Sequence, residues 1–500
     1  MVPDSSLLPL AAVLVPCATA LAIAAARRAP RVVEGLLSAG AIATFAIVGT
    51  LYLQVQDGRV PTTSLGELIP GLELSLRADG MAMVFAILAS VLWVLASFYA
   101  VGYMRGDDAK NRTRFYAFYA FCLGTAFAVA FAGDLFTFFI AYELLTISTY
   151  PLVTHKGDDA AIAAGRKYVT YLIGGGVLVL FGLVIVVAMT GQVAFEPGGF
   201  VGDQLGPLLT SVTFLLFAVG FGTKAGLMPL HAWLPAAMVA PTPVSALLHA
   251  VAVVKAGVFA FGRLIGFVFG PDVLADLPVA TLLQIAAGTT IVVASILALR
   301  QDHLKRRLAY STIAHLAYIV FGFSLLGAGT FEGSLLHIVN HGVAKITLFF
   351  CAGALHVHLH LDHVSELDGV GRKMPFTMGA FALASLGLAG LPPMGGFLSK
   401  WYLVLGAYEE GQLLAAAIMV FSGLFTAGYL FPVVFRAFFR PLPAGQTAPA
   451  RGERRDAARR MVVPLSLTAA FALLLGLGDL SGVYELADAI GDSVAAGGGS

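Results

Sequence analysis

The chain has 500 residues, of which 58% are hydrophobic and 12% are charged, and its formal net charge is +1 at pH 7. A soluble domain carries about 25% charged residues, so this composition indicates a polytopic membrane protein. The near-neutral charge predicts no nucleic-acid partner. Cys17, Cys122 and Cys351 stand singly in apolar runs, so we expect packed thiols, with no disulfide framework and no metal site.

Fourteen stretches are long and apolar enough to cross a bilayer, which takes about 20 residues. The first follows Asp4 with no early positive cluster, so we expect a retained helix and not a cleaved signal. No connection between spans is long enough for a soluble domain. In chain order the predicted spans lie near 5–25, 33–55, 81–103, 113–131, 134–154, 166–190, 207–228, 242–262, 279–299, 308–327, 332–356, 376–406, 412–435 and 461–477.

Most arginines and lysines fall in the connections after the first, third, fifth, ninth, eleventh and thirteenth spans. The opposite side holds only Arg59, Arg77 and Arg263. The positive-inside rule therefore predicts that the basic connections are cytoplasmic and that both termini lie outside.

The remaining cations are Lys224, Lys255, Lys345 and Lys400, all inside predicted spans and none an arginine. Among the acids only Glu143 sits well inside a span, whereas Asp134 falls at a helix edge, where a capping role is expected. Charges inside a membrane are costly and commonly mark ion paths. Four lysines cannot all be neutralised by one glutamate, which favours an ion path over static pairs.

Lysine differs from arginine in that a buried ammonium can lose its proton. Histidines His249, His315, His337 and His341 also fall in predicted spans, and histidine titrates near neutral pH. His337, His341 and Lys345 are spaced i, i+4 and i+8, which predicts one stripe of titratable groups along a helix. His249 and Lys255 are expected on adjoining faces of another helix. His315 by itself is equally consistent with a core histidine.

Two spans contain helix-breaking residues. One is FGTKAGLMPLHAWLP (221–235), and the other contains GLPPMGGFLSKW (390–401). Both carry the string AGL followed closely by proline, with a lysine within ten residues. Proline removes a backbone hydrogen bond, and irregular backbone inside a membrane is tolerated only where protein or water satisfies it. Paired interrupted helices in corresponding halves predict a transporter's ion path.

These motifs resemble the proton-conducting antiporter-like subunits of complex I and its relatives. They cover most of residues 113–405 in the family order. The motifs are AYELLTISTYPLV (141–153), GTKAGLMPLHAWLPAAMVAPTPVSALLHAVAVVKAGVF (222–259), RRLAYSTIAHLAYI (306–319), HIVNHGVAKITLFFCAGAL (337–355) and GLPPMGGFLSKW (390–401).

The resemblance implies an all-α fold of about fourteen helices containing two inverted five-helix repeats. Residues 1–112 would hold helices 1–3, residues 113–262 the first repeat, helices 4–8, and residues 279–435 the second repeat, helices 9–13. Residues 436–500 would form a cytoplasmic basic loop, helix 14 and an outward-facing tail. A polar axis would run through the membrane plane.

The resemblance also implies roles for single residues. Glu143 matches the helix-5 glutamate, and Lys224 matches the broken-helix-7 lysine that pairs with it. Lys255 matches the helix-8 lysine, and His249 matches a polar position one to two turns before it. Three further residues match the connecting positions of helix 11, and one matches the broken helix 12 at the exit. They are His337, His341 and Lys345 for helix 11, and Lys400 for helix 12.

Within the family, lysine at position 400 argues against the M-type subunit of complex I. The STYPLVTHKG stretch and the short segment after helix 14 look most like the D-type subunit of Mrp-type multisubunit Na⁺/H⁺ antiporters. The same traits occur in antiporter-like subunits of membrane-bound hydrogenases, of NADH-quinone oxidoreductases and of inorganic-carbon uptake complexes, which stay open as alternatives. The implied setting is a multi-pass subunit of a bacterial inner membrane, assembled with other membrane subunits.

The expected mechanism is proton movement. When Glu143 releases Lys224, the proton would pass toward His249 and Lys255, and then along helix 11 to Lys400. The implied cargo is protons and Na⁺. No covalent chemistry and no cofactor are expected, because no haem, iron–sulfur or nucleotide motif is visible. A membrane scaffold without transport of its own is the competing class.

Three further segments carry expectations. The run HVHLHLDH (356–363) could bind a metal, but a helix end whose histidines face the negative dipole terminus is favoured. The run RGERRDAARR (451–460) fits a cytoplasmic loop. The tail after about residue 478 is expected to be mobile or to lie on the outer surface.

Overall fold

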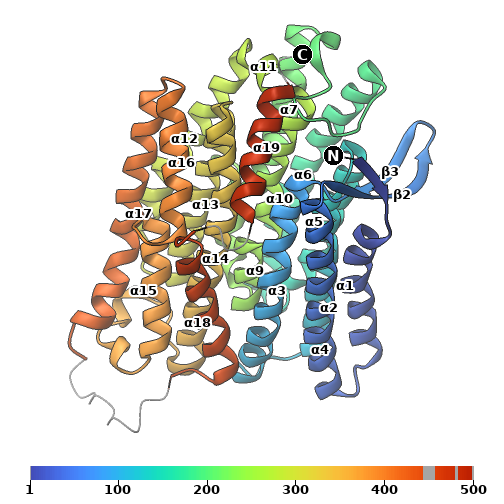
Figure 1. The fold of residues 1–500 in the computed structure, drawn as a ribbon. Coiled ribbons are helices and arrows are strands. Elements are labelled where there is room, and N and C mark those ends of the chain that lie inside the picture. Colours follow the sequence, from blue (N-terminus) through green and yellow to red (C-terminus); the bar gives the residue numbers. More distant parts are fainter. Residues whose placement is uncertain (1, 443–455, 479–481, 498–500) are drawn as a thin grey trace.

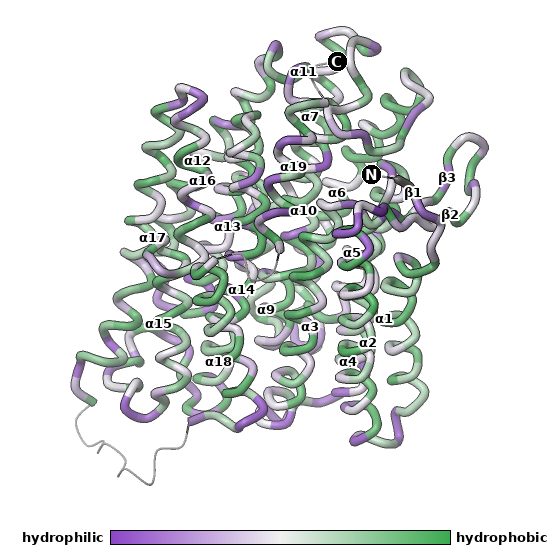
Figure 2. Tube along the Cα trace, in the orientation of Figure 1, coloured by the Kyte–Doolittle hydropathy of each residue, from purple (hydrophilic) through white to green (hydrophobic). Residues whose placement is uncertain are grey.

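A computed structural model of the chain describes residues 2–442, 456–478 and 482–497. The chain forms a bundle of long helices, and the first and last described residues both lie in the upper half of the view (Figure 1). Hydrophilic residues gather at the two ends of the bundle, and hydrophobic residues cover most of the length between them (Figure 2). This distribution suits a bilayer, where helices satisfy their own backbone hydrogen bonds. Arg451, Arg454 and Arg455 of the basic run lie outside the described residues.

The helices follow the order of the predicted spans. Their bounds are α1 (Leu8–Ala25), α2 (Pro30–Gln56), α3 (Gly80–Gly106), α4 (Arg112–Phe131), α5 (Leu135–Val153), α6 (Asp159–Thr190), η1 (Gly202–Gln204), α7 (Pro207–Ala225), α8 (Trp233–Ala236), η2 (Ala237–Val239), α9 (Thr242–Ala250), α10 (Val253–Arg263), η3 (Leu264–Phe269), α11 (Pro271–Ala275), α12 (Pro278–Arg300), α13 (Leu304–Ser324), α14 (Ala328–Leu359), η4 (Val364–Glu366), η5 (Val370–Arg372), α15 (Pro375–Ala389), α16 (Gly395–Glu409), α17 (Leu413–Phe439), α18 (Arg459–Leu474) and α19 (Val483–Gly497).

Eleven helical segments of the described residues are long and apolar enough to cross a membrane. They are α1 to α7, the segment Thr242–Phe269 that contains α9, α10 and η3, α12, α14 and α17. The three other predicted spans are also helical, as α13, as the pair α15 and α16, and as α18. The prediction of a helical polytopic fold is confirmed. The inverted relation of the two five-helix repeats stays a prediction.

A small sheet beside the N-terminus departs from the all-helical expectation. It contains β1 (Val2–Ser5), β2 (Arg59–Ile69) and β3 (Leu72–Arg77) in the order β1-β2-β3, with β1 parallel and β3 antiparallel to β2. Pro70 and Gly71 connect β2 to β3, and Gly71 has φ +82°. Proline followed by a left-handed glycine suits a tight turn. The resulting hairpin projects from the bundle (Figure 1).

Both helix interruptions predicted from glycine and proline are present. α7 ends before Gly226, whose φ is +73°, and helical structure resumes at Trp233. α15 ends before Gly390, whose φ is +85°, and α16 begins at Gly395. Glycine adopts this left-handed conformation without the Cβ clash that other residues meet, which explains why each helix stops there.

A third interruption, between α9 and α10, was not predicted. Val251 and Ala252 leave helical geometry, with φ and ψ of −132° and −49°, and of −88° and −98°. The expectation that His249 and Lys255 share one continuous helix is therefore wrong. No glycine or proline stands between Val244 and Ala256, so the local sequence gives no breaking signal.

The segment after residue 478 was expected to be mobile or to lie on the outer surface, and its described part is an ordered helix with one buried face. Residues 483–497 form α19, which packs in the upper half of the bundle beside α14 and α3 (Figure 1). Its apolar face, including Leu486 and Ile490, is buried. Glycines permit the approach, because a Cβ on Gly491 would lie 2.9 Å from the Ala328 carbonyl oxygen.

Helix α14 occupies the centre of the bundle. Every residue from Thr330 to Leu355 is buried, and α14 packs against α3, α9, α13, α15, α16, α18 and α19. Polar side chains on a helix in this position can face only other protein groups. The predicted stripe of titratable residues therefore lies in the interior, away from lipid.

Candidate functional site

Lys224 lies in the last turn of α7, beside the helix break. Its side chain is 1% exposed, and Nζ donates a hydrogen bond of 2.5 Å to the backbone carbonyl oxygen of Tyr142 in α5. The same ammonium lies 3.2 Å from the centre of the Tyr142 ring. An aromatic face attracts a cation, so Tyr142 stabilises Lys224 by two separate contacts.

Glu143 follows Tyr142 but does not form the direct pair expected with Lys224. Among the described ion pairs, none within 4.0 Å joins Glu143 to Lys224, although the two charges interact electrostatically. Oε1 of Glu143 is buried without a hydrogen-bond partner. The carboxylate packs against α6, where a Cβ on Gly176 would lie within 2.6 Å of Cδ of Glu143. Gly176 therefore provides the space that Glu143 occupies.

Lys255 and His341 join α10 to α14. Nζ of Lys255 lies 2.8 Å from Nδ1 of His341, and both side chains have no solvent exposure. Nε2 of His341 is buried without a partner. Both ring nitrogens of His249 also lack partners, and its ring centre lies 4.7 Å from that of Phe349. Buried polar atoms of this kind are uncommon and costly unless water or function explains them.

α7 and α10 are in backbone contact near these lysines. A Cβ on Gly257 would lie 2.5 Å from the backbone nitrogen of Ala225 and 2.8 Å from the carbonyl carbon of Lys224. Only a residue without a side chain allows this approach. It brings the turn that holds Lys255 against the end of the helix that holds Lys224.

His337 connects α14 to α13 and α16. Its Nδ1 lies 2.9 Å from Oγ of Ser399, and its Nε2 lies 3.0 Å from Nδ1 of His315. The rings of His315 and His341 have centres 5.4 Å apart. His315, for which the sequence left two interpretations, thus lies within the cluster of titratable groups.

A chain of hydroxyl groups links His315 to Lys345. Nε2 of His315 lies 3.3 Å from Oγ1 of Thr426, which lies 3.0 Å from the Tyr429 hydroxyl. Ser311 donates a 3.0 Å hydrogen bond to that hydroxyl, and Lys345 Nζ donates a 2.6 Å hydrogen bond to Ser311. His337 and Lys345 are therefore connected through α13 and α17, and not only along their own helix.

Lys400 lies in α16, beside the second helix break. Its Nζ donates hydrogen bonds of 2.8 and 3.3 Å to the carbonyl oxygens of Leu388 and Ala389, at the end of α15. A Cβ on Gly390 would lie 2.7 Å from Cδ of Lys400, so the glycine at the break also makes room for this side chain. Lys224 and Lys400 thus share an arrangement, in which an ammonium at a broken helix binds backbone carbonyl groups.

Arg263 was expected in an outer connection, but it is buried in α10. Its Nη1 and Nη2 donate hydrogen bonds of 2.7 and 2.8 Å to Asp79, and the rings of Phe195, Phe259 and Phe267 surround the guanidinium at 4.8–5.3 Å. The expectation that no arginine lies within the spans is therefore wrong. The eighth predicted span ended at residue 262, one residue too early to include Arg263, because helical structure continues to Phe269.

The structure also places the two segments that had competing sequence interpretations. Asp134 caps α5 by accepting a 2.6 Å hydrogen bond from the Thr137 backbone, which confirms its capping role. In the run 356–363, His356 lies 3.0 Å from Asp362 and 3.6 Å from Asp107. Among the described residues, no group of three or more His, Cys, Asp or Glu is arranged to hold a metal ion.

Comparison with known proteins identifies the family to which the chain belongs. Residues 132–426 match the family described as "NADH:quinone oxidoreductase/Mrp antiporter, TM", and residues 70–116 match "NADH-Ubiquinone oxidoreductase (complex I), chain 5 N-terminus". The chain belongs to this family. It is a multi-pass, proton-translocating antiporter-like subunit, and the predicted resemblance is confirmed.

Relatives of this antiporter-like subunit belong to several multisubunit membrane complexes. The N-type subunit of NADH-quinone oxidoreductase from Desulforudis audaxviator (strain MP104C) is 35% identical over 425 residues, which cover 81% of this chain and 82% of that protein. The D-type subunit of the Na(+)/H(+) antiporter from Alkalihalophilus pseudofirmus (strain ATCC BAA-2126 / JCM 17055 / OF4) is 28% identical over 449 residues, covering 87% and 88%. The two relatives differ in the complex they serve.

Two solved structures share the fold of the antiporter-like subunit. One is a chain of the membrane-bound sulfane sulfur reductase, an archaeal respiratory membrane complex, with a TM-score of 0.86, 23% identity and 98% coverage of each chain. The other is a chain of the Mrp complex from Dietzia sp. DQ12-45-1b, with a TM-score of 0.84, 21% identity and coverage of 98% and 97%. At this identity the likeness establishes the fold alone.

Sequence reasoning missed several members of the buried network of this antiporter-like subunit. They are Ser311, Thr426, Tyr429, Ser399 and Tyr142, which supply hydroxyl groups or a backbone carbonyl. Hydroxyl residues are common in membrane helices, and the spacing of these residues in the sequence does not predict that they join a network. Only their position opposite a histidine or lysine of another helix identifies them.

Proposed function

We propose that this chain moves protons through the buried network of titratable side chains, as a subunit of a multisubunit Na⁺/H⁺ antiporter of the Mrp type. The observation that carries the proposal is the linkage of Lys345 to His337 through four hydroxyl or imidazole side chains of α13 and α17. Hydroxyl and imidazole groups both donate and accept hydrogen bonds, so a proton can pass along such a chain.

The first half of the proposed path contains Glu143 and Lys224. The Lys224 ammonium binds the Tyr142 carbonyl and ring, and the Glu143 carboxylate lies nearby with one oxygen free of hydrogen bonds. A shift of the carboxylate toward the ammonium would favour the protonated lysine, and a shift away would favour its release of a proton. Glu143 would thereby control the charge on Lys224 without a permanent ion pair.

The central step would cross from α10 to α14 between Lys255 and His341. At 2.8 Å, these two nitrogens can share a proton directly. The unpartnered Nε2 of His341 and the neighbouring ring of His315, whose centres lie 5.4 Å apart, continue the path. His249 and its two free ring nitrogens offer a branch on the α9 side.

The exit would run from His337 to Lys400 in α16. Ser399 contacts His337 and directly precedes Lys400, so both lie on the same helix turn beside the second break. The Lys400 ammonium is held by carbonyl groups and by no carboxylate among the described residues. A cation held this way can give up its proton more readily than one in an ion pair.

The antiporter assignment is supported by the D-type subunit of the Na(+)/H(+) antiporter, which matches this chain over 88% of its length. A second candidate is a proton-pumping subunit of a redox-driven complex, which the 35% identity to the N-type subunit of NADH-quinone oxidoreductase favours. Either assignment implies other membrane subunits as partners. The roles of the relay residues would be the same in both.

The relay is tested in vesicles that contain the whole assembled complex. We expect Glu143→Ala and Lys224→Ala each to lower proton flux on the order of a hundredfold, the usual cost of removing a proton-transfer group. Glu409→Ala and Lys110→Ala remove exposed residues and serve as matched controls. Wild-type flux in both relay variants would refute the relay and favour a scaffold role.

The complex is identified by its energy source. In the antiporter assignment, a sodium gradient imposed on sealed vesicles drives proton movement without any electron donor. In the redox assignment, proton movement requires an electron donor and acceptor and does not respond to sodium. The subunits that purify with this chain give an independent answer.

A further inference from the structure

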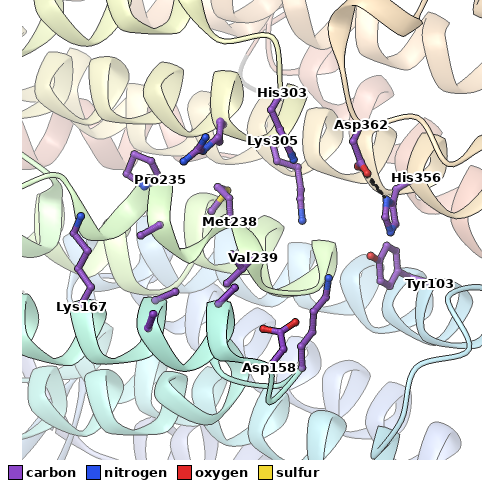
Figure 3. A pocket seen from close by; sticks show the side chains of 16 residues that line it. Tyr103, Asp158, Lys167, Pro235, Met238, Val239, His303, Lys305, His356 and Asp362 are labelled. Carbon is purple, nitrogen blue, oxygen red and sulfur yellow. Dashed lines mark hydrogen bonds and ion pairs between the residues drawn. The ribbon is translucent and has the colours of Figure 1, made fainter.

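A pocket opens at the end of the bundle where the predicted cytoplasmic connections meet. Its volume is about 580 Å³, and it lies among the α5–α6 connection, the start of α6, α8 and η2, the start of α13, and the end of α14 (Figure 3). Ligand-binding pockets commonly measure about 300–1,000 Å³, so this one can hold more than a single ion. The proton path proposed above does not use it.

The pocket gathers positive charge from separate elements. Lys156 comes from the α5–α6 connection, Lys167 from α6, and Lys305 and Arg306 from the first turn of α13. None of these four side chains has a carboxylate within 4.0 Å among the described ion pairs. Lysine and arginine are the side chains that bind phosphate oxygens, arginine through paired hydrogen bonds and lysine as a compact charge.

Both carboxylates in the pocket are already engaged. Asp158 caps α6 by accepting a 2.7 Å hydrogen bond from the backbone of Ala161. Asp362 lies 3.0 Å from Nδ1 of His356, and this hydrogen bond holds the pKa of Asp362 below its ordinary value (Figure 3). Asp362 also attracts Lys305 electrostatically, but two carboxylates cannot balance four cations, so the pocket keeps an excess of positive charge.

A fifth side chain supplies an unused polar atom. Nδ1 of His303, which lines the pocket just before α13, is buried without a hydrogen-bond partner. Burial lowers the pKa of His303, so the neutral ring can donate through one nitrogen. A bound anion would give this nitrogen a partner as well as neutralising the cations.

The rest of the wall is apolar. Small and aliphatic residues line the side formed by α6, α8 and η2, including Ala160, Ala163, Pro235, Met238 and Val239. Beyond the pocket, α6 carries exposed large hydrophobic residues such as Ile173, Val177 and Phe181, which suit contact with lipid. One wall of the pocket is therefore basic and another is aliphatic, and the pocket lies next to a surface suited to contact with lipid.

We propose that this pocket binds the phosphate headgroup of an anionic phospholipid from the leaflet on the basic side of the chain. Anionic lipids concentrate in the cytoplasmic leaflet, and basic pockets between membrane helices recognise their headgroups. Lys156, Lys167 and Arg306 hold the phosphate oxygens, and the alanine and Met238 wall contacts the glycerol and the first carbons of the acyl chains. Free phosphate shares the charged contacts but leaves the apolar wall and most of the volume unused.

The test uses the purified whole assembly in a zwitterionic detergent, titrated with short-chain phosphatidylglycerol and followed by native mass spectrometry. The pocket variant carries Lys156→Gln, Lys167→Gln and Arg306→Gln. The charge-matched control carries Arg27→Gln, Arg28→Gln and Arg31→Gln, which are exposed in the α1–α2 connection and the first turn of α2 at the same end. We expect the pocket variant to need about tenfold more lipid for half-saturation, and the control to match the wild type.

A steric pair keeps the test valid if the pocket variant fails to assemble. Ala163→Trp fills the cavity, whereas Ile162→Trp places the same ring on the neighbouring exposed position outside it. Only Ala163→Trp should weaken lipid binding. In a separate arm, millimolar inorganic phosphate should not displace the lipid.

Two outcomes would overturn the proposal. Equal lipid binding by the pocket variants and their controls would show that the pocket is not a headgroup site. Displacement of lipid by inorganic phosphate, with phosphate itself bound by the wild type and lost in the pocket variant, would assign the pocket to a free anion.

Discussion

Nζ of Lys255 lies 2.8 Å from Nδ1 of His341, although 86 residues separate them in the sequence. The contact joins α10 to α14 at the centre of the bundle, where neither side chain reaches solvent. One proton can occupy this contact in two ways, on the lysine or on the imidazole. No other described hydrogen bond between side chains joins α10 to α14. A proton that crosses between these helices along the proposed path must therefore pass through this pair.

Removing either partner should interrupt proton movement. We expect Lys255→Ala and His341→Ala to lower flux on the order of a hundredfold. Lys255→Arg should not rescue flux, because a guanidinium stays protonated. The control is His360→Asn, an exposed site with φ +54° where asparagine is tolerated. Full activity of Lys255→Arg would mean that position 255 needs only a fixed charge.

The hydroxyl chain between His315 and Lys345 gives a second prediction. Tyr429→Phe removes one hydroxyl and leaves the ring, so packing should be kept while the link between Thr426 and Ser311 is lost. We expect proton flux to fall about tenfold or more, with normal assembly of the complex. Tyr408→Phe makes the same change on an exposed side chain and should transport protons as the wild type does. Equal flux in the two variants would contradict a role for the Tyr429 hydroxyl.

The glycine run 174–176 in α6 provides a matched steric test of Glu143. A Cβ on Gly176 would lie within 2.6 Å of Cδ of Glu143, whereas a Cβ on Gly174 meets nothing within 4 Å. We expect Gly176→Ala to displace the carboxylate, cost about 1–3 kcal/mol through overpacking and lower flux. Gly174→Ala should leave both the melting temperature and flux unchanged. Similar flux in the two variants would argue that the position of Glu143 is unimportant.

Lys400 distinguishes a proton carrier from a fixed charge. Its ammonium binds the carbonyl oxygens of Leu388 and Ala389, and an arginine could preserve those hydrogen bonds. We expect Lys400→Arg to assemble normally and yet to transport as poorly as Lys400→Ala, because arginine retains its proton. Measured flux equal to the wild type in Lys400→Arg would refute a proton-carrying role.

The Asp79–Arg263 pair should contribute stability and not transport. Burial alone would raise the pKa of Asp79, but the charge and hydrogen bonds of Arg263, with the Ala82 backbone, outweigh it, so the pKa is lowered. Breaking a buried pair costs about 3–5 kcal/mol, so Asp79→Asn should lower the melting temperature. Replacing both residues, as Asp79→Asn with Arg263→Met, should recover part of the loss.

The sign of the pH dependence follows from the lowered pKa of Asp79. The ionised pair contributes its full stability above the ordinary carboxyl pKa, about 3.9, and loses it as the pH falls through the lower value in the folded protein. The difference in melting temperature between wild type and Asp79→Asn should be constant near neutral pH and shrink only in acid. A difference that shrinks between pH 6 and 8 would contradict this assignment.

The sequence by itself determined the helical membrane fold, the position of the spans, and the two breaks after Ala225 and Ala389. Each of these depends on a property contained within a short window, namely hydropathy or the backbone geometry of glycine and proline. The buried lysines and histidines were also visible, because titratable residues are conspicuous inside apolar runs.

Only the tertiary structure decided which groups these residues contact. Lys224 binds the Tyr142 carbonyl and not Glu143, Lys345 reaches His315 through Tyr429, and Arg263 is paired inside the bundle. The break at Val251 and the return of α19 into the bundle were likewise absent from any local pattern. Such partners depend on the rotation and packing of helices that are far apart in the chain, and a window of sequence does not contain that information.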